Sequence, residues 1–226
     1  MIALTRQDRN PIIRWDYVTD QFDDILAALL QHLELTVLAV ALGLAVAAPL
    51  SALALRHDWT TSAITGFTGF LYTLPSVALF AVLVPLFGFS RISTVIPLAA
   101  YTLLILVTNI IAGFRSVPEA VIDSANGMGL TPTRRVWSVE LPLAMPSIIT
   151  GIRIATVSTV GLLTVAAIIG QGGLGRLILD GLRRAFWTPM TVGALLSIGL
   201  ALVLDLLILW LGRAATPWIR ARKAPQ

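Results

Sequence analysis

Two ionisable side chains interrupt long apolar stretches of this sequence and are the first candidates for chemistry. Arg153 stands inside the stretch 147–169, and Asp205 stands inside the stretch 190–212. A charged side chain is costly in an apolar environment, so each is a functional candidate. If both stretches cross a membrane as helices, both side chains lie ~10–12 Å deep from the same side, at about 1.5 Å of rise per residue. We therefore expect them to form an ion pair; the alternative is that each extends separately towards water or another polar group.

The residue types that most enzymes and metal sites use are scarce. The chain has no cysteine, which excludes disulfides and cysteine-based metal or redox sites. His32 and His57 have no second histidine or carboxylate at ligand spacing, so we expect them at span ends rather than on a metal. The glycines of 170–175 could cradle a phosphate, but no Gly-Lys-Ser/Thr follows them. We therefore expect that the chain has no catalytic residue, metal or cofactor and that it is not an enzyme.

The composition indicates an integral membrane protein. Of its 226 residues, 57% are hydrophobic and only 12% are charged, and the mean hydropathy is +0.86. In a soluble domain about a quarter of the residues are charged, and disordered chains contain few apolar residues. The composition therefore excludes both classes. The isoelectric point of about 10.3 could suggest nucleic acid, but the net charge of +4 is spread without a basic run, so no nucleic-acid partner is expected.

The elements that must position these residues are membrane-spanning helices. A helix that crosses ~30 Å of hydrocarbon needs about 20 apolar residues. The sequence therefore predicts an all-α integral membrane protein with about five transmembrane helices. The stretches that meet the requirement are 33–55, 66–87, 92–114, 147–169 and 190–212.

The chain divides into three predicted regions. The transmembrane domain covers 33–213, and a basic tail, 214–226, follows it. The N-terminal segment 1–32 has no apolar core typical of a signal peptide, and its part 20–31 reads as an amphipathic helix on the membrane surface. An odd number of spans places the two ends of the chain on opposite sides of the membrane. The basic tail favours a cytoplasmic C-terminus and an N-terminus outside.

The segment 116–146 is too polar for a span, and it contains the start and stop signals of short helices. Ser116 and Glu119 have the spacing of a capping box, which predicts the start of a short helix. Gly127 and Gly129 offer a left-handed end to it. The alternative is an ordinary surface loop.

A second short helix follows in the same segment. Thr131 can cap its start, and Pro132 stands in the first turn, where proline is tolerated. We expect this helix to end before Pro142. The segment is therefore predicted to be a helix, a glycine turn and a second helix.

The part 123–142 of this segment resembles the coupling loop of ATP-binding-cassette (ABC) importer permeases. The family pattern is Glu-Ala-Ala, three residues, Gly, nine residues, and Ile-x-Leu-Pro. This chain keeps the spacing, with Asp for Glu, Ser for the first Ala and Val for Ile. The resemblance implies a cytoplasmic coupling loop, seated in a groove of a separate ATPase. Its candidate residues are Asp123, Ser124, Ala125, Gly127, Gly129, Leu141 and Pro142.

The segment 170–188 is the second stretch that breaks the apolar pattern. Its glycines exclude a regular helix, and apolar residues at helical spacing follow them, so we expect a break and then a short amphipathic helix on the outer side. It is either a re-entrant element near a gate or a plain outer loop.

Pro75 can kink the second span, and the kink either lines the transport path or reflects irregular packing. The candidate gate residues are Pro75, Gly170, Gly172, Gly173 and Gly175.

Several segments within 32–182 resemble one subgroup, the osmoprotectant (glycine betaine, choline, carnitine) importer permeases. They include LYTLPSVALF, GMGLTP, ELPLAMPSIITGIRIATVSTVG and AAIIGQGGLG. The related methionine or other amino-acid importer permeases are the alternative. No aromatic cage is expected inside the spans, because the tryptophans stand at span ends or in loops.

The resemblance also implies the partners and the location of the chain. The partners are a cytoplasmic ABC ATPase dimer, a second permease subunit (identical or paralogous) and a periplasmic or extracellular substrate-binding protein on a separate chain. The location is the bacterial cytoplasmic (inner) membrane. A stand-alone channel or secondary transporter is the alternative of a different class, but we find no inverted repeat, and that class would leave 116–146 unexplained.

Overall fold

The computed structural model describes residues 13–218, and every element within this range is helical. The basic residues of the predicted tail beyond residue 218 lie outside the described range. The helices are α1 (Trp15–Asp20), α2 (Phe22–Ala54), α3 (Asp58–Thr73), α4 (Ser76–Phe87), α5 (Arg91–Arg115), α6 (Glu119–Gly127), α7 (Pro132–Arg135), α8 (Leu141–Val165), α9 (Leu174–Arg183) and α10 (Trp187–Ala215).

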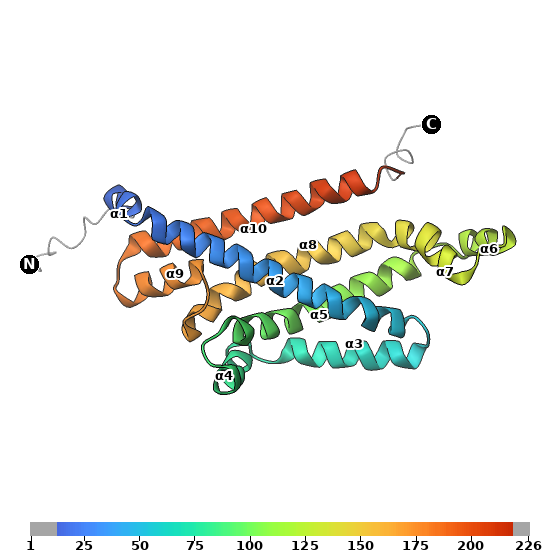
Figure 1. Cartoon of the computed structure of the whole chain (residues 1–226), viewed down its shortest axis with the longest axis horizontal. Helices are drawn as coiled ribbons and strands as arrows, with labels where there is room; N and C mark the ends of the chain where they lie inside the picture. Colours follow the sequence, from blue (N-terminus) through green and yellow to red (C-terminus); the bar gives the residue numbers. More distant parts are fainter. Residues whose placement is uncertain (1–12, 219–226) are drawn as a thin grey trace, which may run out of the picture.

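The long helices form an elongated bundle (Figure 1). α2, α5 and α8 run along its length, α3 packs against α2 and α5, and α10 packs against α8 and α9. α6 and α7 project at one end, while α1 and α9 lie at the other. Four helices are long and apolar enough to cross a membrane, and the pair α3–α4 makes a fifth span if it is counted as one. The expectation of about five spans is therefore confirmed.

Close contact between α2 and α5 depends on small residues. Ala39, Gly43 and Ala47 recur every fourth position on α2 and are all buried. A Cβ atom added at Gly43 would lie 1.9 Å from Oγ1 of Thr102 on α5. Small residues at this spacing let helix backbones approach closely in a membrane, where apolar side chains gain little from leaving lipid.

The second predicted span is not one straight helix. α3 and α4 meet at an angle of 89°. The break lies at Leu74 and Pro75, which both have extended backbone (ψ 137° and 127°). Proline has no backbone N–H and disfavours helical geometry in the residue before it, so the helix ends here and a new one begins. The kink predicted at Pro75 is therefore a full change of direction.

The expected amphipathic surface helix 20–31 is wrong. Residues 22–31 form the first turns of α2, which continues without a break into the apolar span. Ile25 and Ala28 are buried in a cluster with Leu174 and Leu177 of α9. Part of the apolar face of this segment therefore packs on protein, because α9 returns to cover it, while Phe22 and Leu26 are exposed.

The expected capping box at the start of α6 is also wrong. Ser116 ends α5: its backbone N–H donates to Ala112 O, and its hydroxyl donates to Gly113 O at 2.7 Å. Pro118 takes the N-cap position of α6 and provides no side-chain hydrogen bond. The spacing of Ser116 and Glu119 fits a capping box, but the end of α5 uses the serine first.

The helix that begins at Thr131 does not end before Pro142. α7 passes into a π-helical turn, Val136–Glu140, and this turn passes directly into α8. Pro132 to Ile169 thus form one helical element of 38 residues. A wider turn just before a proline can accommodate its ring and its missing N–H, which explains why the helix continues.

Candidate functional site

The α6–α7 hairpin has a closed hydrogen-bonding pattern at its turn. Gly129 has a left-handed backbone (φ 75°), and the N–H groups of Gly129 and Leu130 donate to Asn126 O and Ala125 O. This pattern satisfies the last carbonyls of α6. Thr131 caps α7, as predicted, by accepting a bond from Arg134 N. Gly129 therefore has the predicted terminating role, whereas Gly127 lies inside α6.

Arg135 holds the hairpin on the end of the bundle. Its Nη1 donates to Oδ1 of Asn126 at 2.7 Å, and its Nε donates to Oε1 of Glu140 at 2.6 Å. One side chain thus joins α6, α7 and the π-helical turn. The hairpin is connected to α8 both covalently and by this bridge, so it can move as one piece with that helix.

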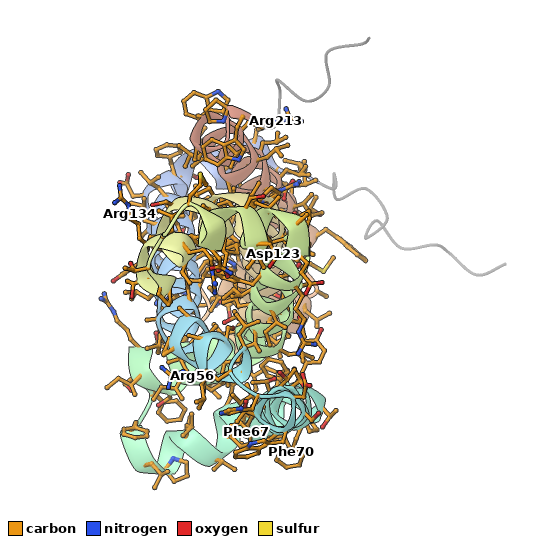
Figure 2. All side chains as sticks on the ribbon, turned by 90° about the vertical axis from the view of Figure 1, so that its right-hand side faces the viewer. Arg56, Phe67, Phe70, Asp123, Arg134 and Arg213 are labelled. Atoms are coloured by element: carbon orange, nitrogen blue, oxygen red, sulfur yellow. The ribbon has the colours of Figure 1, made fainter. Side chains whose placement is uncertain are left out.

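The predicted coupling residues separate into an exposed and a buried set. Asp123 and Ser124 are exposed on α6, and Met128 at its tip is 73% exposed. Ala125 is only 1% exposed, so its side chain packs inside the hairpin and is not part of the outer face. Leu141 and Pro142 are half-buried at the start of α8. Figure 2 views this end of the molecule, with Asp123 and Arg134 on the hairpin.

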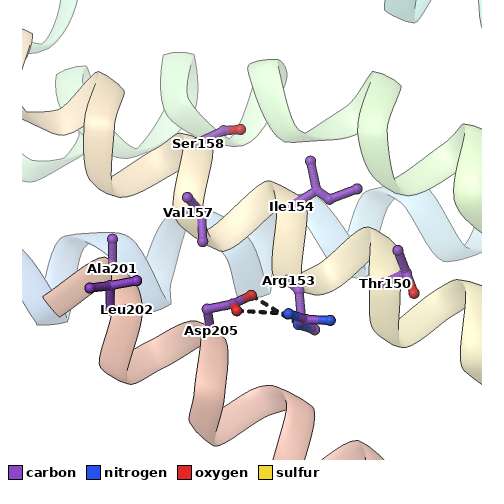
Figure 3. A pocket seen from close by; sticks show the side chains of 8 residues that line it. All are labelled: Thr150, Arg153, Ile154, Val157, Ser158, Ala201, Leu202 and Asp205. Atoms are coloured by element: carbon purple, nitrogen blue, oxygen red, sulfur yellow. Dashed lines mark hydrogen bonds and ion pairs between the residues drawn. The ribbon is translucent and has the colours of Figure 1, made fainter. Parts of the chain in front are cut away.

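Arg153 of α8 and Asp205 of α10 form a two-bond ion pair between the two helices (Figure 3). Nε and Nη2 of Arg153 donate to the two carboxylate oxygens at 2.8 and 2.7 Å. Their side chains are 27% and 25% exposed. The pair borders a cavity of about 400 Å³, which is also lined by Thr150, Ile154, Val157, Ser158, Ala201 and Leu202. The ion pair expected between these two residues is therefore present in the structure.

A pair of tyrosines stabilises the bend between α3 and α4. The rings of Tyr72 and Tyr101 meet edge to face, with centroids 5.8 Å apart. The Tyr101 hydroxyl donates to the carbonyl of Leu74, which the break leaves without a helical partner. This pair was not predicted from the sequence, because the two residues lie on different helices. The available signal was the tyrosine that stands two residues before the Leu-Pro break.

Removing that hydroxyl should weaken the bend. We expect Tyr101→Phe to lower the free energy of unfolding by about 1–2 kcal/mol, because a part-buried carbonyl inside a membrane protein loses its donor. Thermal unfolding in detergent measures the effect. Tyr72→Phe is the matched control, because the Tyr72 hydroxyl makes no hydrogen bond within residues 13–218. Equal melting temperatures for the two variants would contradict this role of Tyr101.

Gly172, Gly173 and Gly175 of the glycine break after α8 are buried at the α1–α9 end, whereas Gly170 is exposed. Gly170 and Gly173 have left-handed backbone (φ 72° and 49°). A Cβ atom at Gly172 would lie 2.6 Å from Ala167 N, and one at Gly175 would lie 2.3 Å from Thr164 O. The predicted break and the short helix after it, α9, are confirmed. α9 packs against α10 and the start of α2, so the segment is an integral part of the bundle.

His32 is completely buried inside α2 and does not lie at the end of that helix, where the sequence had led us to expect it. Nδ1 lies 3.2 Å from Gly172 O, and Nε2 lies 3.1 Å from Val160 O. The imidazole thus connects α2 to the glycine break and to α8. His57 is exposed, as expected. Within residues 13–218 no group of three or more His, Cys, Asp or Glu side chains could hold a metal ion.

Comparison with known proteins agrees with this architecture. Osmoprotectant import permease protein OsmW of Salmonella typhimurium is 36% identical over 206 residues, which are 89% of this chain and 96% of that protein. Choline transport system permease protein OpuBB of Bacillus subtilis is 35% identical, covering 86% of this chain and 89% of the relative. A solved chain of the MetNI methionine ABC transporter, in inward-facing conformations, has a TM-score of 0.76 at 18% identity and covers 87% of this chain and 98% of that chain. This last likeness concerns the fold alone.

The family assignment rests on most of the described range. Residues 37–217 match the family described as binding-protein-dependent transport system inner membrane component. The match includes the α6–α7 hairpin, the Arg153–Asp205 pair and the glycine break. It identifies a multi-pass membrane transport subunit rather than an enzyme. This chain therefore belongs to the family of inner membrane permease components of binding-protein-dependent ABC transport systems.

Proposed function

We propose that this chain is the permease subunit of an ABC importer that carries a quaternary-amine osmoprotectant, such as glycine betaine, choline or carnitine, into the cytoplasm. Relatives that are 34–36% identical over most of the chain are named for these compounds. The amino-acid alternative is supported by fold likeness to solved amino-acid transporters, at 18% identity for the methionine transporter and 16% for another amino acid ABC transporter. Sequence identity over the spans is the better guide to the substrate, because the fold is shared by both groups.

The observation that carries the transport mechanism is the connection between α6, α7 and α8. The hairpin projects from one end of the bundle (Figure 1), and its second helix continues as a 38-residue element that reaches the glycine break at the other end. A force applied to α6 therefore acts on the whole length of α8. ATP hydrolysis takes place on a separate subunit, so such a mechanical connection is what a permease needs.

The partners follow from the two ends of the bundle. We assign the exposed face of α6, with Asp123 and Ser124, to the ATPase dimer, which places the α6–α7 end in the cytoplasm and α1 outside. The opposite end, with α9 and the glycine break, then faces the substrate-binding protein. A second permease subunit, identical or paralogous, completes the path through the bacterial cytoplasmic membrane.

Uptake measurements test this function. Cells that express this chain with its ATPase and binding protein should accumulate radiolabelled glycine betaine, choline or carnitine, and cells that lack only this chain should not. Radiolabelled methionine is the comparison substrate. Accumulation of methionine without any of the three osmoprotectants would contradict the substrate class, and the same uptake with and without the chain would contradict the permease function.

A further inference from the structure

The guanidinium of Arg153 has hydrogen-bond donors left over. A guanidinium carries five N–H groups. Arg153 donates two of them to Asp205: the single N–H of Nε and one N–H of Nη2. Both N–H groups of Nη1 and the second of Nη2 have no acceptor within residues 13–218. Inside a membrane span, polar groups must be satisfied by protein, water or a ligand. The side chain can thus accept a further anionic group without releasing Asp205.

The cavity beside the pair has room for such a group. It measures about 400 Å³ and lies between α8 and α10 (Figure 3). The hydroxyl of Ser158 on its wall makes no hydrogen bond within residues 13–218. Ser158 also borders a narrower gap lined by Tyr72 and Tyr101, so the polar surface of α8 continues from the ion pair towards the bend. Figure 3 shows the Ser158 hydroxyl pointing away from the ion pair, so the unused donors of Arg153 are the polar groups that face the cavity.

The rest of the cavity wall is apolar. Ile154, Val157, Ala201 and Leu202 line it. A quaternary ammonium group cannot donate a hydrogen bond, and its methyl groups suit an apolar wall with a carboxylate nearby. Asp205 is that carboxylate: each of its oxygens accepts one hydrogen bond from Arg153 and keeps a further lone pair. The cavity thus presents an anion site and a methylammonium site side by side.

We propose that this cavity is a binding site for a zwitterionic methylammonium carboxylate on its way through the permease. The carboxylate of the ligand binds the free N–H groups of Arg153, and its methylated ammonium lies beside Asp205 against the apolar wall. The two dipoles are then antiparallel, so no net charge is added to the membrane interior. A purely cationic compound such as choline gains only Asp205 and is repelled by Arg153. The proposal rests on the proposed function and specifies its substrate class.

The test is the double variant Arg153→Gln with Asp205→Asn in the complete importer, reconstituted in lipid vesicles. Both new side chains are neutral and can hydrogen-bond to each other, so neither leaves an unpaired charge in the membrane. Uptake of radiolabelled glycine betaine should fall by about 10-fold or more, whereas uptake of choline should change by less than about 3-fold. The ratio of the two rates is the readout, because a general loss of structure would lower both.

A second ion pair between spans serves as the matched control. Arg91 of α5 donates to Glu34 of α2, outside this cavity. The double variant Glu34→Gln with Arg91→Gln should leave the ratio of uptake rates unchanged. Unchanged glycine betaine uptake in the Arg153/Asp205 variant, or equal losses for both compounds, would overturn the site. An unaltered importer that moves neither compound would instead contradict the proposed function.

Discussion

A Ser124→Trp variant is expected to lose its ATPase partner while the chain remains folded in the membrane. Ser124 is exposed in the middle of α6, and its only hydrogen bond is from its hydroxyl to Ala120 O at 2.7 Å. A large side chain at this position would hold α6 away from a groove that receives it. We expect association to weaken by about 100-fold or more, which corresponds to about 2.7 kcal/mol, and osmoprotectant uptake to fall to background.

Co-purification with the ATPase and uptake in the same cells measure this effect. Thr19→Trp is the matched control, because Thr19 is an exposed hydroxyl residue on α1, at the opposite end of the bundle. The control should keep the ATPase. The melting temperature of each purified variant shows whether the chain has folded. A Ser124→Trp variant that retains the ATPase at the level of the control would contradict the assignment of α6 as the docking helix.

A Gly173→Val variant is expected to fold poorly, with a loss of more than about 3 kcal/mol in the free energy of unfolding. The backbone of Gly173 is left-handed (φ 49°), which disfavours any side chain and a β-branched one most. A Cβ atom there would also lie 2.5 Å from Ala28 O and 2.7 Å from both N and Cβ of His32. The start of α2 would have to move away from the glycine break, and the buried bonds of His32 would be lost with it.

Gly170 provides the matched control for this prediction. It is also left-handed (φ 72°), but a Cβ atom added to it would meet nothing within 4 Å. Gly170→Ala should therefore lower the free energy of unfolding only by the cost of a left-handed backbone at alanine, about 1–2 kcal/mol. Thermal unfolding in detergent and the yield of monodisperse protein compare the two variants. A Gly173→Val variant as stable as Gly170→Ala would show that the close approach of α2 is not required.

The exposed surface of α3 and α10 fits a membrane environment. Phe67 and Phe70 of α3 are exposed on the outer side of the bundle (Figure 2). In the most apolar stretch of α10, only 11% of the residues are buried inside the chain. Large apolar side chains on the surface of a soluble protein would mark a binding patch, but here lipid covers them at little cost.

Features that depend on composition and local backbone were readable from the sequence alone. These were the apolar lengths of the spans, the break at Pro75, the cap at Thr131 and the left-handed turn at Gly129. Proline, glycine and capping residues act on their immediate neighbours, and a length of about 20 apolar residues is needed by any helix that crosses the bilayer. The Arg153–Asp205 pair was also accessible, because charges are rare in spans and equal depth brings them together.

Only the tertiary structure decided which faces of the helices meet. The 89° bend of α3–α4, the burial of His32 and Ala125, and the continuity of α2 through residue 32 all depend on contacts between residues distant in sequence. The spans are apolar on every side, so their periodicity does not distinguish a face that packs on protein from one that packs on lipid. In a soluble helix the polar stripe makes that distinction; in the bilayer it is made by small residues, and which helix fills the space beside them depends on the whole bundle.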